Sequence, residues 1–156
     1  MACDIFTSGR VMLVVWGKPE LRDLARVDEA ARVAYERHGP LIFIARVPAH
    51  AVAPDEDLRG AMAKLLERFT ARCATYHTVL EGSGFFAAAK RTALATLFLM
   101  TGKRSKHFVH SRCDDVPTAL PHELRAELRD ALRLFRARRW LDDLRSLPPG
   151  TQARAG

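Results

Sequence analysis

The chain has 156 residues, of which 48% are hydrophobic and 28% charged, which suits one folded domain and excludes extended disorder. Its three cysteines are an odd number without a C-x-x-C pair, and they indicate free thiols. The chain shows no signal-peptide pattern and no run of the about 20 apolar residues that a membrane-spanning helix needs. We therefore expect a cytoplasmic protein.

The net charge of +7 is unevenly distributed. Residues 1–81 carry 11 basic and 11 acidic side chains, and residues 114–156 carry 8 basic and 7 acidic ones. Residues 82–113 carry six basic side chains and no acidic one. Nearly all of the excess positive charge therefore lies in one segment of the chain, residues 82–113.

The N-terminal part predicts a hairpin followed by a helix. Residues 4–7 and 11–16 are short apolar runs, and Ser8-Gly9 suits the tight turn between them. Pro19 suits the start of a helix, and Gly39-Pro40 suits its end. Apolar residues recur at helical spacing between them, and the expected buried face is Leu24, Val27, Ala31, Ala34 and Tyr35.

The run LIFIARV at residues 41–47 predicts a strand buried on both faces, at the centre of a sheet. After the loop at residues 48–54, carboxylates at 55–57 indicate the first turn of a second helix. Its predicted apolar stripe is Leu58, Met62, Leu65, Phe69 and Cys73. A strand is expected at residues 76–81.

Gly82-Ser83-Gly84 predicts the start of a third helix, which is apolar over residues 85–100 and ends at Gly102. Residues 106–111 alternate well enough for a last strand. An amphipathic helix is expected over residues 121–147. One of its faces comprises Leu124, Leu128, Ala131 and Phe135, and a second apolar set comprises Leu134, Trp140, Leu141 and Leu144.

This order of elements predicts an α/β fold with a mixed, mostly parallel sheet of about five strands covered by helices. We expect one α/β domain at residues 1–120. The C-terminal helical extension at 121–147 would pack on this sheet or on a partner, and the polar tail at 148–156 would be flexible.

The element order, with acids opening the second helix and Gly-Ser-Gly opening the third, resembles the STAS domain and the related sporulation anti-sigma-factor antagonists. The resemblance covers about residues 3–120. It implies a bacterial regulatory module that binds partner proteins, often switched by phosphorylation of a serine or threonine at the start of the second helix. Residues 48–58 contain no hydroxyl side chain, so the sequence departs from that pattern.

The resemblance implies a partner-binding surface at Asp55, Glu56, Asp57, Ser83 and Gly84. The three acids could supply permanently the negative charge that phosphate supplies in a switchable relative. Acids are common in the first turn of a helix, however, and we favour ordinary capping as the explanation.

The Gly-Ser-Gly turn at residues 82–84 could hold an anion through its backbone N–H groups. The complete phosphate-loop and dinucleotide motifs are absent, so turn and capping roles are favoured. The basic side chains nearby form a candidate anion-binding set, with solvation of the charges as the simpler interpretation: Lys90, Arg91, Lys103, Arg104 and Lys106.

His107, His110, Cys113 and Asp114 are metal-ligand types close together in the sequence. On a strand, however, His107 and His110 point to opposite faces, so we expect no metal site. No catalytic constellation can be recognised, and neither an enzymatic activity nor a cofactor is expected.

Three functional hypotheses follow, in order of preference. The first is a non-catalytic protein-interaction module of STAS-like type, whose partner is another protein or a second copy bound through the C-terminal helix. The second is binding of nucleic acid or acidic lipid through segment 82–113. The third is binding of a nucleotide or another small molecule at the ends of the parallel strands.

Overall fold

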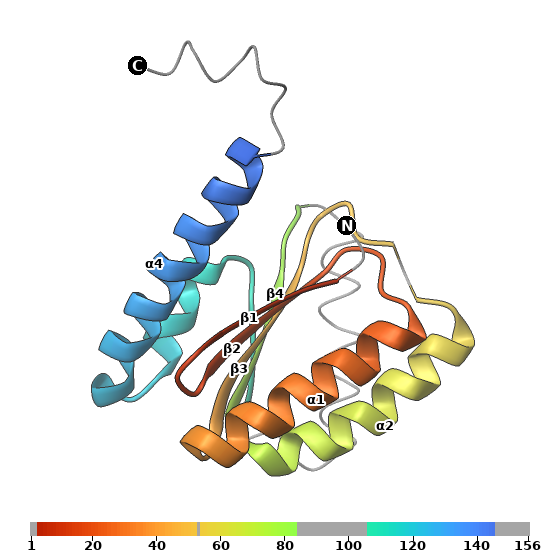
Figure 1. Cartoon of the computed structure of the whole chain (residues 1–156), viewed down its shortest axis with the longest axis horizontal. Coiled ribbons are helices and arrows are strands. Elements are labelled where there is room, and N and C mark those ends of the chain that lie inside the picture. The colour runs from red at the N-terminus through yellow and green to blue at the C-terminus, as the bar shows by residue number, and fades with distance from the viewer. Residues whose placement is uncertain (1–2, 53, 84–105, 146–156) are drawn as a thin grey trace.

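The computed structural model describes residues 3–52, 54–83 and 106–145, of which residues 140–145 are described by their backbone alone. The chain forms a five-stranded sheet with helices on both faces (Figure 1). The elements in chain order are β1 (Cys3–Ser8), β2 (Val11–Trp16), α1 (Leu21–His38), β3 (Leu41–Val47), α2 (Glu56–Arg72), β4 (Cys73–Leu80), β5 (His107–His110), the 3₁₀ helix η2 (Cys113–Ala119) and α4 (His122–Arg145).

The strands lie in sequence order, β1-β2-β3-β4-β5. β1 and β2 are antiparallel and joined by a two-residue turn, in which Gly9 has a positive φ of 56°. The pairs β2–β3, β3–β4 and β4–β5 are parallel. These observations confirm the predicted α/β class, the mostly parallel five-stranded sheet and the central place of residues 41–47.

One face of the sheet is covered by α1 and α2, which lie side by side in Figure 1. Alternate strand residues such as Met12, Val14 and Phe43 meet apolar helix residues there. The Phe43 ring lies 4.7 Å from that of Phe69 on α2 and 4.9 Å from that of Tyr76 on β4. This layer forms the first hydrophobic core.

The opposite face is covered by η2 and α4. Val11, Leu13, Ile42 and Ile44 point to this side and are buried. The side chains that α4 buries against them recur at three and four residues, as one helix face requires: Leu128, Ala131, Leu132 and Phe135. The helix at the C-terminal end of the chain therefore packs on its own sheet and completes a second core.

Some local expectations were wrong. Tyr35, which was assigned to the buried face of its helix, is 39% exposed, and Leu134 of the second apolar set is 56% exposed, because each lies beside the contacting row of its helix. Cys73 begins β4 and is not part of α2, since the chain passes from helix to strand without an intervening loop residue. The strand predicted at residues 76–81 therefore starts three residues earlier.

The predicted third helix at residues 85–100 and the tail at 148–156 lie outside the described residues. Gly84, Lys90, Arg91, Lys103 and Arg104 are also outside them. Within the ranges that the structure describes, none of the helices has the length and apolar character of a membrane span.

Candidate functional site

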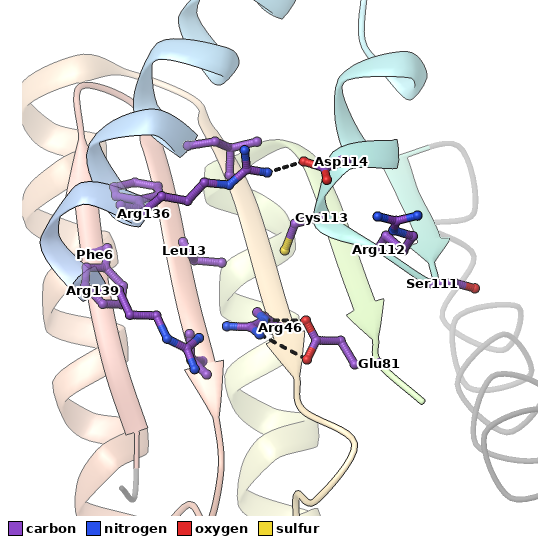
Figure 2. Close-up of a pocket in the computed structure, with 13 residues that line it drawn as sticks. Phe6, Leu13, Arg46, Glu81, Ser111, Arg112, Cys113, Asp114, Arg136 and Arg139 are labelled. Atoms are coloured by element: carbon purple, nitrogen blue, oxygen red, sulfur yellow. Dashed lines mark hydrogen bonds and ion pairs between the residues drawn. The ribbon is translucent and has the colours of Figure 1, made fainter. Parts of the chain in front are cut away.

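A pocket of about 450 Å³ opens between the sheet and α4, at the carboxyl ends of the parallel strands (Figure 2). Val15 of β2 and Arg46 of β3 line it near the ends of their strands. Glu81 and Ser111 line it immediately after β4 and β5. The same face of β3 carries Ile42 and Ile44 beneath α4, and Arg46 follows two residues later on that face because side chains alternate along a strand.

One wall of the pocket is apolar. It is formed by side chains from β1, β2 and α4, namely Phe6, Leu13, Val15, Leu132 and Phe135. The rings of Phe6 and Phe135 lie 5.7 Å apart and are inclined by 42°, which is a favourable aromatic geometry. The wall is an extension of the second core, so its shape is fixed by packing.

The other wall is charged and contains two ion pairs. The Arg46 guanidinium donates from Nε to Glu81 Oε1 at 2.6 Å and from Nη2 to Glu81 Oε2 at 3.0 Å. Both side chains are partly buried, which strengthens a bidentate pair of this kind. Arg136 on α4 donates to Asp114 at the start of η2. The first pair joins β3 to the residue that follows β4, and the second joins α4 to η2.

Two further arginines, Arg112 and Arg139, also line the pocket. Among the residues described, neither Arg112 nor Arg139 forms an ion pair. In Figure 2 the Arg139 side chain extends from α4 toward Arg46. Four guanidinium groups against two carboxylates leave the pocket lining with two excess positive charges.

Cys113 contributes a thiol to the pocket. Burial raises its pKa above the ordinary value, although the guanidinium of Arg46 acts in the opposite direction. The group is therefore a neutral thiol near pH 7, and it adds polarisable surface to the pocket.

Beside this pocket, β4 and β5 carry a chain of polar contacts. His77 is completely buried, and its Nδ1 lies 3.0 Å from His110 Nε2 while its Nε2 lies 3.0 Å from Thr75 Oγ1. The rings of His77 and Phe108 stack at 5.1 Å. Burial lowers the pKa of His77 to about 3, and the neighbouring histidines act in the same direction. We interpret these groups as a neutral hydrogen-bond network that joins the two strands.

His107 lies on the other face of the sheet, where its Nε2 is 3.0 Å from Thr78 Oγ1 and its ring is 5.2 Å from that of Tyr76. His107 and His110 thus point to opposite faces, as their spacing predicts. In the described part of the chain, the side chains of His, Cys, Asp and Glu do not form a group of three that could hold a metal ion.

The partner-binding residues that were proposed from the sequence have different structural roles. Asp55 caps α2, and its Oδ1 accepts a hydrogen bond of 2.8 Å from the Leu58 N–H. Glu56 and Asp57 follow in the first turn and are exposed. Ser83 is exposed in the loop after β4, and Lys106, the one described member of the predicted anion-binding set, is also exposed.

Sequence reasoning missed the residues that form the charged wall. Arg46 stands alone in an apolar strand, and a largely buried charge requires a partner, so this position was a usable signal. Arg136 and Arg139 lie on a helix rich in arginine, and nothing in the sequence separates them from solvated neighbours such as Arg138.

Searches with protein-family models, among characterised proteins and among solved structures gave no match to this chain.

Proposed function

We propose that this protein binds a small molecule in the pocket at the strand ends, and that it acts as a binding module without catalytic activity. The observation that carries the proposal is the pairing of an apolar wall with a charged wall in one pocket of about 450 Å³. Ligand pockets in proteins combine a mostly apolar lining with a few fixed polar groups, and their volumes are of this order.

The position of the pocket supports the same proposal. Open α/β sheets bind ligands at the carboxyl ends of their parallel strands, which is where Val15, Arg46 and Glu81 lie. The polar groups favour binding over turnover. Guanidinium groups do not exchange protons near neutral pH, the two carboxylates are held in ion pairs, and the Cys113 thiol has a raised pKa.

Thermal melting tests this proposal. Wild-type protein should be melted with a panel of organic acids, phosphate esters and uncharged metabolites, since a ligand that binds only the folded state raises the midpoint. The variant Val15→Trp would fill the pocket from its sheet side and should lose the response. Leu134→Trp adds the same side chain at an exposed position of α4 and should retain it. A panel in which no member raises the wild-type midpoint would contradict the proposal.

A second candidate function is the regulatory protein-interaction module of STAS-like type. It is favoured by the exposure of Glu56, Asp57 and Ser83, which follow the carboxyl ends of the neighbouring parallel strands β3 and β4. A partner protein would contact this edge of the sheet. A second copy bound through α4 would instead use the outer face of that helix, where Leu134 is exposed.

Affinity capture from the native host tests the second candidate. Glu56→Lys together with Asp57→Lys reverses two exposed charges and leaves the Asp55 cap intact, so the fold should survive while partner binding is lost. Glu67→Lys, an exposed acid in a later turn of α2, is the matched control. Equal recovery of a partner by the double variant and by wild type would exclude this surface.

A further inference from the structure

Two arginines of the pocket that form no ion pair within the described part of the chain indicate the chemistry of its ligand. Arg112 and Arg139 bring positive charge to a wall that already holds Arg46 and Arg136. Arg46 is partly buried, whereas Arg112, Arg136 and Arg139 are exposed. Like charges that share one pocket repel one another, and an anion that binds there lowers this repulsion. The same wall would disfavour a cationic ligand.

Arg46 and Arg139 form the best-defined part of this wall. The two bonds from Arg46 to Glu81 use Nε and Nη2, so Nη1 remains to donate to another acceptor. Glu81 also fixes the orientation of the Arg46 guanidinium before any ligand arrives. Arg139 extends from α4, and Figure 2 shows its side chain directed toward Arg46.

The neighbouring apolar wall determines the chemical character of the rest of the ligand. Phe6, Val15 and Phe135 offer ring and branched aliphatic surfaces beside the arginines. An inorganic anion would leave this surface in contact with water, whereas an apolar body attached to the anionic group would cover it.

We infer that the pocket binds a small organic anion, in which a carboxylate or phosphate group lies between Arg46 and Arg139 and an apolar body lies against Phe6, Val15 and Phe135. This inference rests on the proposed function and makes it specific. Guanidinium groups bind carboxylate and phosphate oxygens through paired N–H donors, so both head groups fit the site.

Displacement of a fluorescent probe tests the inference. The probe is 8-anilinonaphthalene-1-sulfonate, which carries an anionic group on an apolar body and should bind saturably with one equivalent per chain. The competitors share one naphthyl body: 1-naphthoate, 1-naphthyl phosphate and uncharged 1-naphthol. Inorganic phosphate serves as an anion without an apolar body.

We expect 1-naphthoate or 1-naphthyl phosphate to displace the probe at a concentration about tenfold lower than 1-naphthol, since a hydrogen bond to a charged group contributes about this factor. The comparison of the two anions identifies the preferred head group. Inorganic phosphate should require a far higher concentration than either.

The variant Arg139→Gln should weaken probe binding roughly three- to tenfold. The loss of binding should be smaller at high salt, because salt screens the charge of Arg139. Arg138→Gln removes the same charge from the neighbouring exposed residue, which does not line the pocket, and should change binding less than about twofold. Far-ultraviolet circular dichroism of both variants should match that of the wild type.

The outcomes separate this inference from the proposed function. Displacement by 1-naphthol as effective as that by the naphthyl anions, or equal effects of the two arginine variants, would overturn the anionic head group. Displacement by inorganic phosphate as effective as that by 1-naphthyl phosphate would overturn the apolar body. Absence of saturable binding by the probe and by 1-naphthol would contradict the ligand-binding function itself.

Discussion

The Arg46 guanidinium and the Glu81 carboxylate form a bidentate ion pair across the ends of β3 and β4, with N–O distances of 2.6 and 3.0 Å. Their side chains are 21% and 31% exposed. The pair connects two neighbouring strands at the point where the sheet ends and the pocket begins. It therefore contributes to both the stability of the strand ends and the charge of the pocket.

Glu81→Gln should lower the free energy of unfolding by about 1 to 2 kcal/mol, because it leaves a partly buried guanidinium without its counter-charge. The same change should strengthen binding of an anionic probe, since Arg46 is no longer neutralised. Urea unfolding and probe titration measure the two effects. Glu29→Gln removes an acid from the exposed pair with Arg32 and should alter stability less. Weaker anion binding by Glu81→Gln would show that orientation of Arg46 matters more than its net charge.

The histidines of β4 and β5 predict that stability falls in acid. Burial lowers the pKa of His77 to about 3 and that of His107 to about 4, and it also lowers the pKa of His110. A histidine in the unfolded chain has a pKa near 6.5. Below that pH the unfolded state binds protons that the folded state excludes, so stability is complete above about pH 6.5 and declines toward about pH 4.

Urea unfolding at several pH values between 7.5 and 4.5 measures this decline. Each of these histidines can contribute at most about 1.4 kcal/mol per pH unit. His77→Gln retains hydrogen-bonding capacity beside Thr75 and His110, and it should make the decline shallower. The exposed His38 offers the control His38→Gln, for which the wild-type slope is expected. If both variants retain that slope, another group causes the loss of stability.

The fold was predictable because its signals are local. Apolar runs at residues 11–16 and 41–47 and the helical spacing of Leu24, Val27 and Ala31 each determine one element and its buried face. The βαβ order then limits the sheet to a mostly parallel arrangement. The errors were the assignment of Cys73 to α2 and the expected burial of Tyr35. Both depend on packing with distant parts of the chain.

The pocket was not predictable because its parts meet only in the folded protein. Arg46 and Arg139 lie 93 positions apart, and their common location depends on where α4 crosses the sheet. The contact between His77 and His110 likewise depends on the parallel register of β4 and β5. The charge distribution along the sequence showed an excess of basic residues at 82–113, whereas most of the arginines in the pocket come from outside that segment.

The three cysteines should differ in reactivity in the folded protein. Cys3 and Cys73 are 6% and 3% exposed, and burial raises the pKa of each to about 12. Cys113 is half-buried at the pocket. Brief treatment with iodoacetamide at pH 8 should therefore modify Cys113 first and more slowly than a free thiol, as read by peptide mass spectrometry.

Saturation of the pocket with the naphthalene sulfonate probe should slow the modification of Cys113 further. The variant Cys113→Ser should remain unmodified over the same interval. Modification of Cys73 before Cys113 would indicate that the β4 end of the first core opens more readily than its burial suggests.

The contact between α4 and the sheet determines whether the pocket exists, because α4 supplies Leu132, Phe135 and Arg139 to its walls. Leu128 is completely buried at the centre of this contact, whereas Leu134 on the same helix is 56% exposed. Leu128→Ala should lower the free energy of unfolding by about 2 to 5 kcal/mol through lost burial and the cavity it creates. Leu134→Ala should change it by less than about 0.5 kcal/mol. Urea unfolding measures both, and equal small effects would mean that α4 is detached from the sheet in solution. In that case binding of the naphthalene sulfonate probe should be lost as well, since one wall of the pocket would be missing.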